Sequence, residues 1–302
     1  MSTDSKIEWT DHTFNAWWGC VKVHSGCANC YAETLDTRYG GNHWGKGNPR
    51  RMIVGEWSKP AQWNAAAKAA GVRARVFCMS MGDLFEDFDG PVLDQLDRPV
   101  EMAQHKGRFW TVPLLRHRVF QIIEETPWLD WLLLTKRPEN VVDMSPVHWR
   151  DKFPSNVMVG TSPCDQKTAD KCIIDLLKVP AKRFLSIEPL LGAVYISQLP
   201  CGTLERVGAK SKPVSFNPLR LNIYEKTTEL SNAPGIHWVI VGGESGHGAR
   251  AMKPEWVRSL RDECVENGVP FLFKQWGGVR KKETGRELDG RTWDEFPELV
   301  GV

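Results

Sequence analysis

The sequence lacks long apolar segments and a dominant charge. No run approaches the ~18 uninterrupted apolar residues of a membrane-spanning helix, and the first residues, MSTDSKIEWTDHTFNAWW, contain no apolar core of signal-peptide length. The 39 Lys and Arg residues are nearly balanced by 37 Asp and Glu residues, which leaves a formal net charge of +2. We therefore expect a cytoplasmic protein that does not contact a membrane. Charge alone does not predict binding to nucleic acid, although local basic segments still allow it.

Several familiar motifs are missing as well. The Gly-rich stretch GGESGHGAR (242–250) lacks the Gly-Lys-Ser/Thr ending of a Walker loop and does not match G-x-G-x-x-G. A second C-x2-C pair, internal repeats and low-complexity tracts are also absent from the sequence. These absences exclude the common phosphate-binding loops and leave a four-cysteine zinc site without its usual second half.

Most of the eight cysteines stand alone in the sequence. In a reducing compartment, isolated cysteines are more often core thiols than disulfide partners, because a free cysteine behaves as a small hydrophobic residue. We expect this packing role for five of them: Cys78, Cys164, Cys172, Cys201 and Cys264.

A repeated pattern predicts the fold. Short apolar runs end in small and charged residues, and a helical stretch follows several of them, which is typical of parallel strands joined by crossover helices. We expect a partial or complete (β/α) barrel, with a doubly wound sheet as the alternative. The expected strands lie in 75–85, 131–138, 157–165, 183–190, 238–246 and 270–278, and the expected helices in 114–125, 166–178 and 254–267.

Three segments fall outside this repeat. Residues 40–60 form a Gly- and Arg-containing insertion, and residues 199–235 form a longer one that includes Arg206, Lys210, Lys212 and Arg220. The tail contains an Asp-Gly pair between short alternating runs, which predicts a hairpin. We expect an α/β domain over 1–276 and a hairpin tail over 277–302.

The stretch GCVKVHSGCANCYAE (19–33) holds the other three cysteines, with the spacing Cys20-x6-Cys27-x2-Cys30. Thiolates of this kind suit zinc or an iron–sulfur cluster. One alternative is a structural zinc completed by His24 or by a distant residue. Another is three unliganded thiols. The third is an iron–sulfur cluster held by three cysteines, with one iron open to a cofactor or substrate.

With three cysteines at the front of a parallel α/β barrel, the chain resembles radical S-adenosylmethionine enzymes. Two features depart from that pattern: the usual spacing is C-x3-C-x2-C, and Asn29 stands where an aromatic residue normally precedes the third cysteine. The ordered stretches GCANCYAE, LLTKRPEN, SIEPLLG, GGESGHGAR and FLFKQWG resemble the phage-associated three-cysteine-motif proteins, which are regarded as radical S-adenosylmethionine-like.

The resemblance implies a [4Fe-4S] cluster on Cys20, Cys27 and Cys30, with S-adenosylmethionine as the second cofactor. Its pattern places the cysteine loop after the first strand and cofactor contacts at the strand ends. Candidate cofactor-binding residues are Tyr31, Ser80, Met81, Asp83, Thr161, Ser162, Glu188, Gly242, Gly243 and Glu244. Asp83 would accept hydrogen bonds from the amino group of the cofactor, and the hydroxyls of Thr161 and Ser162 would approach its ribose.

Other polar residues at the strand ends are candidates for substrate contacts. We expect Glu188, Lys136 and Lys274 to be catalytic, and Lys274 and Gln275 to bind an anionic substrate group. Glu188 could instead form a salt bridge with Lys136 or Arg137. Glu244, Ser245 and Arg250 lie in the Gly-rich stretch, whose backbone N–H groups could hold a phosphate or carboxylate.

The resulting expectation is a radical enzyme that forms a 5′-deoxyadenosyl radical and modifies or isomerises a nucleobase or nucleotide, for instance in phage DNA. It would need a flavodoxin- or ferredoxin-like reductant, and it would act in the host cytoplasm if a phage encodes it. The alternatives are a zinc-stabilised nucleic-acid-binding accessory protein without catalysis, and a radical enzyme that acts on a peptide or small metabolite.

Overall fold

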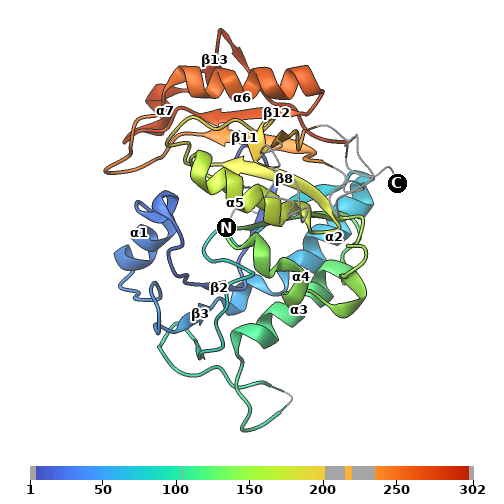
Figure 1. The fold of residues 1–302 in the computed structure, drawn as a ribbon. Coiled ribbons are helices and arrows are strands. Elements are labelled where there is room, and N and C mark those ends of the chain that lie inside the picture. The colour runs from blue at the N-terminus through green and yellow to red at the C-terminus, as the bar shows by residue number, and fades with distance from the viewer. Residues whose placement is uncertain (1–4, 104, 201–214, 220–234, 299–302) are drawn as a thin grey trace, which may run out of the picture. The chain divides into compact units, whose positions relative to one another are not determined.

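A computed structural model describes residues 5–103, 105–200, 215–219 and 235–298 (Figure 1). The chain forms two compact units: unit 1 comprises residues 1–160 with 299–302, and unit 2 comprises 161–298. The boundary between the two units lies near residue 160. Residues of the tail belong to unit 2 because their backbone bonds to its last strand, as when Phe273 N–H donates to the Trp293 carbonyl over 2.9 Å.

Of the four main strands of unit 1, all but the first lie at predicted apolar runs. Their order is β1 (His12–Phe14), β4 (Ala74–Cys78), β6 (Leu129–Thr135) and β7 (Val157–Thr161). The pairs β1–β4 and β4–β6 are parallel. In their register, Phe14 lies beside Cys78, and Cys78 lies beside Leu133, so the strands end at one edge. Each run stops being a strand where its sequence becomes polar.

The helices of unit 1 vary in how clearly the sequence marks them. Helix α3 (Val112–Glu125) has a proline in its first turn and buries the apolar face formed by Leu115, Val119 and Ile123. Helix α2 (Lys59–Ala70) packs on β4 and β6 and ends at Gly71, whose φ of 65° favours glycine. The remaining elements are α1 (Tyr31–Arg38), α4 (Val141–Met144) and the 3-10 turns η1 (Ser25–Cys27), η2 (Val54–Glu56), η3 (Pro138–Asn140) and η4 (Val147–Trp149).

A second, smaller sheet in unit 1 contains part of the segment expected as an insertion. Strand β3 (Arg50–Met52) pairs antiparallel with β2 (Trp17–Trp18) and parallel with β5 (Val92–Leu93). Residues 40–60 are therefore fixed to the segment that leads into the cysteine loop, because β2 ends directly before it.

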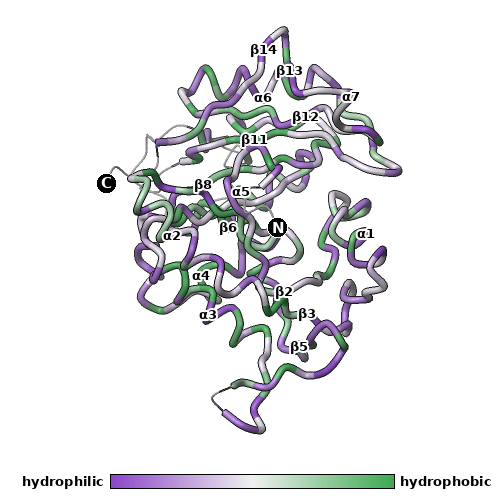
Figure 2. Tube along the Cα trace, turned by 180° about the vertical axis from the view of Figure 1, so that it is seen from behind, coloured by the Kyte–Doolittle hydropathy of each residue, from purple (hydrophilic) through white to green (hydrophobic). Residues whose placement is uncertain are grey.

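Unit 2 is built around three parallel strands. Strand β11 (Trp238–Gly242) lies between β8 (Lys182–Ile187) and β12 (Phe271–Gln275). Helix α5 (Gln166–Leu177) begins with a capping box of Asp165 and Thr168. Helix α6 (Pro254–Asn267) packs on β12 and ends at Gly268, as its Asn-Gly pair predicts. Hydrophobic and hydrophilic residues alternate along both helices (Figure 2).

The tail forms the predicted hairpin. Strands β13 (Glu287–Leu288) and β14 (Arg291–Thr292) pair antiparallel around Asp289 and Gly290, whose φ values of 54° and 80° suit a tight hairpin turn. The short helix α7 (Lys281–Thr284) precedes them. Strands β9 (Leu199–Pro200) and β10 (Ser215–Phe216) also pair antiparallel. Most of the expected insertion over 199–235, including Arg206, Lys210, Lys212 and Arg220, lies outside the described residues.

The parallel α/β class is thus confirmed for both units. Four isolated cysteines, namely Cys78, Cys164, Cys172 and Cys264, are buried free thiols, as predicted; Cys201 lies outside the described residues. Among the helices that the structure describes, each is too short or too polar to cross a bilayer.

Candidate functional site

The cysteine loop is fastened to the end of strand β4. Gly19 N–H donates to the Met81 carbonyl over 3.0 Å, and Gly19 forms a parallel bridge with Gly82. Gly19 has a φ of 118°, and a Cβ atom on it would lie 2.4 Å from the His43 carbonyl oxygen. Only glycine therefore allows the loop to leave β2 at this point and approach the edge where the parallel strands end.

The three clustered cysteines come from three adjoining pieces of backbone. Cys20 follows Gly19, Cys27 closes η1, and Cys30 is the N-cap of α1, where its side chain makes no capping hydrogen bond. All three are free thiols of intermediate exposure. Cys20 and Cys30 pack on one apolar cluster formed by Ala32, Trp44 and Met81.

Lys22 lies near the other two thiols. A hydrogen bond with Glu33 is the main cause of the raised pKa of Lys22, and the sulfur atoms of Cys30 and Cys27 add to it. Within the described part of the chain, no group of three or more His, Cys, Asp or Glu side chains is arranged to hold a metal ion. The residue types nevertheless fit a thiolate-bound metal or cluster, because three cysteines of intermediate exposure belong to one loop.

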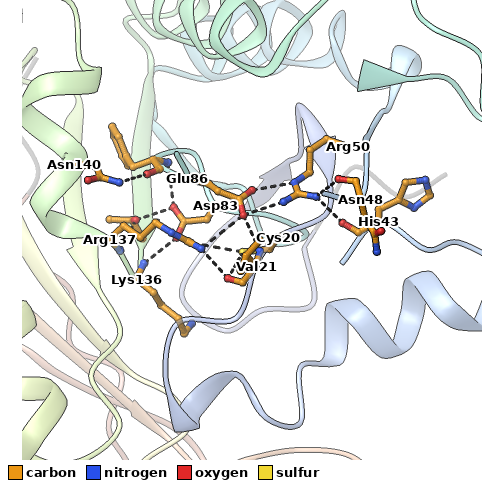
Figure 3. A network of polar contacts seen from close by, with 12 residues as sticks. Cys20, Val21, His43, Asn48, Arg50, Asp83, Glu86, Lys136, Arg137 and Asn140 are labelled. Carbon is orange, nitrogen blue, oxygen red and sulfur yellow. Dashed lines mark hydrogen bonds and ion pairs between the residues drawn. The ribbon is translucent and has the colours of Figure 1, made fainter. Parts of the chain in front are cut away.

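A buried ionic network joins this loop to the strand ends of unit 1 (Figure 3). Arg137, which follows β6, donates from Nη1 to Asp83 Oδ2 over 2.8 Å and from Nη2 to the Val21 carbonyl over 2.7 Å. Its Nη1 also lies 3.7 Å from Cys20 Sγ, and its Nη2 lies 3.6 Å from Glu86 Oε1. One guanidinium thus contacts the cysteine loop and the segment that follows β4.

Asp83 is an internal acceptor in this network. Its Oδ1 accepts from the Thr135 hydroxyl at 2.7 Å and the Phe85 N–H at 3.0 Å. Its Oδ2 accepts from the Lys136 N–H at 3.1 Å as well as from Arg137. The carboxylate is 4% exposed. Binding of a cofactor amino group, the role predicted for Asp83, would have to compete with these four donors.

Glu86 connects the network to β3. Its carboxylate accepts two hydrogen bonds of 2.9 Å from the fully buried Arg50, and a third of 2.7 Å from Val21 N–H. Arg50 also donates to the carbonyls of His43 and Asn48. Arg50 is therefore an internal residue, which removes it from the basic groups that residues 40–60 could offer to a nucleic acid.

The thiol of Cys20 has an unusual electrostatic environment. The pKa of Cys20 is raised to about 12: burial is the main cause, the carboxylates of Asp83 and Glu86 add to it, and Arg137 acts in the opposite direction. A bound cation would favour the thiolate that these surroundings disfavour.

The other predicted cofactor residues of unit 1 lie around the same strand end. The exposed Tyr31 donates its hydroxyl to the Ser80 carbonyl over 2.8 Å, so it links the start of α1 to the end of β4. Asn15 accepts from Met81 N–H over 2.7 Å and donates to the Ser80 hydroxyl over 3.0 Å. Lys136 is half-buried, and its side chain extends away from the network in Figure 3.

Unit 2 has its own pair of charged residues at the strand ends. Lys274 Nζ lies 2.7 Å from Glu188 Oε2, and the Ser186 hydroxyl donates to Glu188 Oε1 over 3.2 Å. Within unit 2, Glu188 pairs with Lys274, and within unit 1, Arg137 pairs with Asp83. A Cβ atom on Gly242 would lie 2.9 Å from Glu188 Oε2, so this glycine leaves room for the carboxylate.

Four of the remaining candidates in unit 2 form two hydrogen-bonded pairs. Arg250 donates from its backbone and its guanidinium to Glu244, which fixes the Gly-rich stretch. Gln275 donates to the Ser245 hydroxyl over 2.6 Å. Thr161 is the last residue of β7, Ser162 follows it, and both are buried. A Cβ atom on Gly243 would lie 1.9 Å from the Trp276 carbonyl oxygen, so this glycine is needed for close backbone packing.

Sequence reasoning missed several residues that build the site of unit 1. Glu86, Arg116 and Asn140 were not considered, although Arg116 donates to the Leu84 and Glu86 carbonyls and Asn140 to the Phe85 carbonyl. His43 was also missed; its Nδ1 lies 2.8 Å from Asp36 Oδ1, and both residues are buried. The alternating acidic and apolar residues directly after β4 were the available signal. His24 accepts from Gly26 N–H and caps η1.

Comparison with known proteins gives one match. Residues 4–107 and 111–297 match the model of a family described as a protein of unknown function (DUF5131). No curated protein and no solved structure matches the chain.

Proposed function

The chain belongs to the DUF5131 family, and we propose that it is a radical S-adenosylmethionine enzyme whose [4Fe-4S] cluster is held by Cys20, Cys27 and Cys30. The proposal includes the partial (β/α) barrel of radical S-adenosylmethionine type that the resemblance implies.

One observation carries the proposal: the cysteine loop follows β1 and is fixed at the carboxyl ends of parallel strands. Hydrogen bonds from Gly19 to Met81 and from Arg137 to Val21 hold the loop there. Ligands of parallel α/β folds bind at this edge. A metal site built on this loop would therefore lie where such folds bind ligands.

The described residues of unit 1 would perform distinct tasks. The three thiols would be the cluster ligands, and the apolar cluster of Ala32, Trp44 and Met81 would shield Cys20 and Cys30 from water. Tyr31 would present its exposed ring beside the loop while its hydroxyl stays bonded to Ser80. When bound, such a cluster and S-adenosylmethionine together supply a 5′-deoxyadenosyl radical that takes a hydrogen atom from a substrate.

In unit 2, Lys274 would bind an anionic group and Glu188 would exchange a proton with a bound molecule. Both side chains are partly accessible, with 16% and 13% exposed. The proposed substrate class is a nucleobase or nucleotide, and a flavodoxin- or ferredoxin-like protein in the cytoplasm would be the electron donor. This part follows from the resemblance alone, and the buried Arg50 is not available to contact a nucleic acid.

Iron and sulfide analysis after anaerobic purification tests the cluster. We expect about four irons per chain, and the Cys27→Ala variant should lose most of them because one of three ligands is gone. Cys172→Ala is the matched control, since Cys172 is a buried free thiol on α5. Stoichiometric zinc without iron would contradict the cluster and favour the zinc-stabilised accessory protein.

The chemistry has a separate test. The iron-loaded protein, given a strong reductant and S-adenosylmethionine, should form 5′-deoxyadenosine, and Cys27→Ala should form none above background. Iron-loaded protein that forms no 5′-deoxyadenosine under these conditions would contradict the radical reaction while leaving the cluster in place.

A further inference from the structure

The three cysteines differ in what lies against their sulfur atoms. Arg137 Nη1 is 3.7 Å from Cys20 Sγ, and the Arg137 side chain is only 12% exposed. We propose that Arg137 is a positioning residue that donates to the sulfur of Cys20 and makes Cys20 electrostatically distinct from Cys27 and Cys30. A consequence, which rests on the proposed function, is that Arg137 raises the reduction potential of the cluster.

Hydrogen bonds to two different groups hold the Arg137 guanidinium in place. Asp83 holds Nη1 at 2.8 Å, and the Val21 carbonyl holds Nη2 at 2.7 Å. Asp83 is itself held by Thr135 and by the backbone of Phe85 and Lys136. Because the guanidinium is planar and rigid, two fixed nitrogens leave it little freedom to turn away from Cys20.

The ion pairs of the network also favour this positioning role of Arg137. Arg50 makes a two-pronged pair with Glu86, while Arg137 lies farther from Glu86, at 3.6 Å. Arg137 is therefore the cation that balances Asp83 and faces the sulfur. The pair is buried, so water screens it little.

Cys27 and Cys30 have a different surrounding. The cation near them is Lys22, which is 46% exposed and bonds to Glu33 at 2.7 Å and to the Ala28 carbonyl at 3.4 Å. Among the described residues, no arginine donates to the sulfur of either cysteine. The asymmetry thus arises from one guanidinium on one thiol.

The physical consequence has a definite sign. Reducing a cluster adds one negative charge, and a cation or donor at a ligand sulfur stabilises that charge. Removing the Arg137 charge would leave Asp83 and Glu86 beside the sulfur. The cluster would then become harder to reduce, so its potential would fall.

The contact can be tested without a cluster. Chelator-treated, reduced full-length protein is alkylated with iodoacetate and, separately, with iodoacetamide, and the rate at each cysteine is read by peptide mapping. At one thiol, the ratio of the iodoacetate rate to the iodoacetamide rate reports the local charge, because only iodoacetate is charged. Accessibility and thiolate fraction affect both reagents alike. In Arg137→Gln the ratio should fall at least about fivefold at Cys20, because one charge about 4 Å away has this effect even in water, and it should stay unchanged at Cys27 and Cys30.

Two further variants serve as controls for this measurement. Arg73→Gln breaks the Arg73–Asp130 pair, which is about as buried as Arg137–Asp83, and it should not change the ratio at Cys20. Arg137→Lys keeps the charge and should give a ratio close to wild type, which also serves if Arg137→Gln fails to fold by circular dichroism. An unchanged ratio in folded Arg137→Gln, or an equal fall in Arg73→Gln, would overturn the proposal.

The cluster consequence needs the iron-loaded protein. Redox titration followed by electron paramagnetic resonance should give a lower midpoint for Arg137→Gln, equivalent to about a tenfold smaller reduced-to-oxidised ratio, or about 59 mV for one electron. An unchanged midpoint in a loaded variant would overturn the tuning while the proposed function stands. A chain that binds no iron would overturn the proposed function, and the alkylation ratio would still decide the contact.

Discussion

Polar side chains at the ends of β4 and β6 in unit 1 form one connected network, whereas those at the ends of β8, β11 and β12 in unit 2 form separate pairs. In unit 1, Arg137, Asp83, Glu86 and Arg50 share partners and are almost completely buried. In unit 2, Glu188 pairs with Lys274 and Glu244 with Arg250, with no shared member.

This difference indicates that the two sets of charged residues have different roles. A network whose carboxylates already accept several hydrogen bonds holds backbone segments in place, and here those segments include the cysteine loop. A pair that is partly exposed, such as Glu188–Lys274, can exchange a partner for a ligand at lower cost. We therefore infer that the network of unit 1 positions the cysteine loop, whereas the ligand contact proposed for unit 2 would be made by the Glu188–Lys274 pair.

The most direct test of this difference between the units is to neutralise one carboxylate in each. Glu86→Gln removes the charge that pairs with the fully buried Arg50. Removing one partner of a buried pair costs about 3–5 kcal/mol, so urea unfolding should show a loss of this size.

Glu188→Gln is the matched change in unit 2. Its partner Lys274 is partly exposed, and the amide can still accept a hydrogen bond, so the loss should be about 1 kcal/mol or less. Equal losses in the two variants would contradict the assignment of different roles.

Two neighbouring glycines of unit 2 differ in what an added Cβ atom would contact. Gly243→Ala places a Cβ atom 1.9 Å from the Trp276 carbonyl oxygen, and backbone has to move to relieve this contact. We expect a loss of about 3 kcal/mol in the free energy of unfolding, measured by urea denaturation.

Gly242→Ala is the control for that change. Its Cβ atom meets the flexible end of Glu188, at 2.9 Å from Oε2, so the side chain can move instead of the backbone. A smaller loss than in Gly243→Ala is expected, and a larger one would show that the Glu188 position is rigid.

The stability of unit 2 should also depend on pH. Burial, together with nearby Arg183 and Lys182, lowers the pKa of His237 from 6.5 to about 4, and its Nδ1 accepts from the Arg183 N–H over 3.2 Å. Between these pH values the unfolded chain binds the proton and the folded chain does not, so stability falls as the pH decreases from 6.5 to about 4. Allowing for solvent screening of this half-buried ring, we expect about 1–2 kcal/mol.

Urea unfolding at pH 7 and pH 5 measures this slope. His237→Asn retains an acceptor but does not titrate, so the contribution of this residue to the slope should disappear. A slope that is the same in wild type and His237→Asn would contradict the assignment to His237.

Local sequence patterns were sufficient for the regular elements with strong apolar signals. The strands β4, β6, β7, β8, β11 and β12 and the helices α3, α5 and α6 all overlap the predicted segments, although β4, β6, β8 and α3 begin one or two residues earlier. Strand β1 has three residues and gives no usable pattern. Helix α2 was missed although Pro60 in its first turn and Gly71 after its end are the same kind of start and stop signals that marked α6.

The candidate site was predicted less completely. The cysteine spacing identified the loop, and the strand ends identified Asp83, Glu188 and Lys274. The partners were mostly not predicted: Asp83 pairs with Arg137, Glu188 with Lys274, and Glu86 with the buried Arg50.

The sequence by itself determined the parallel α/β class, the cysteine-rich loop and the polar strand ends, because each depends on residues that are close together along the chain. The tertiary structure alone decided which charges pair and which thiol faces a guanidinium. Arg137 and Cys20 are 117 residues apart, and Arg50 and Glu86 are 36 apart. Such pairs depend on how distant segments pack, and burial makes each choice of partner worth several kcal/mol.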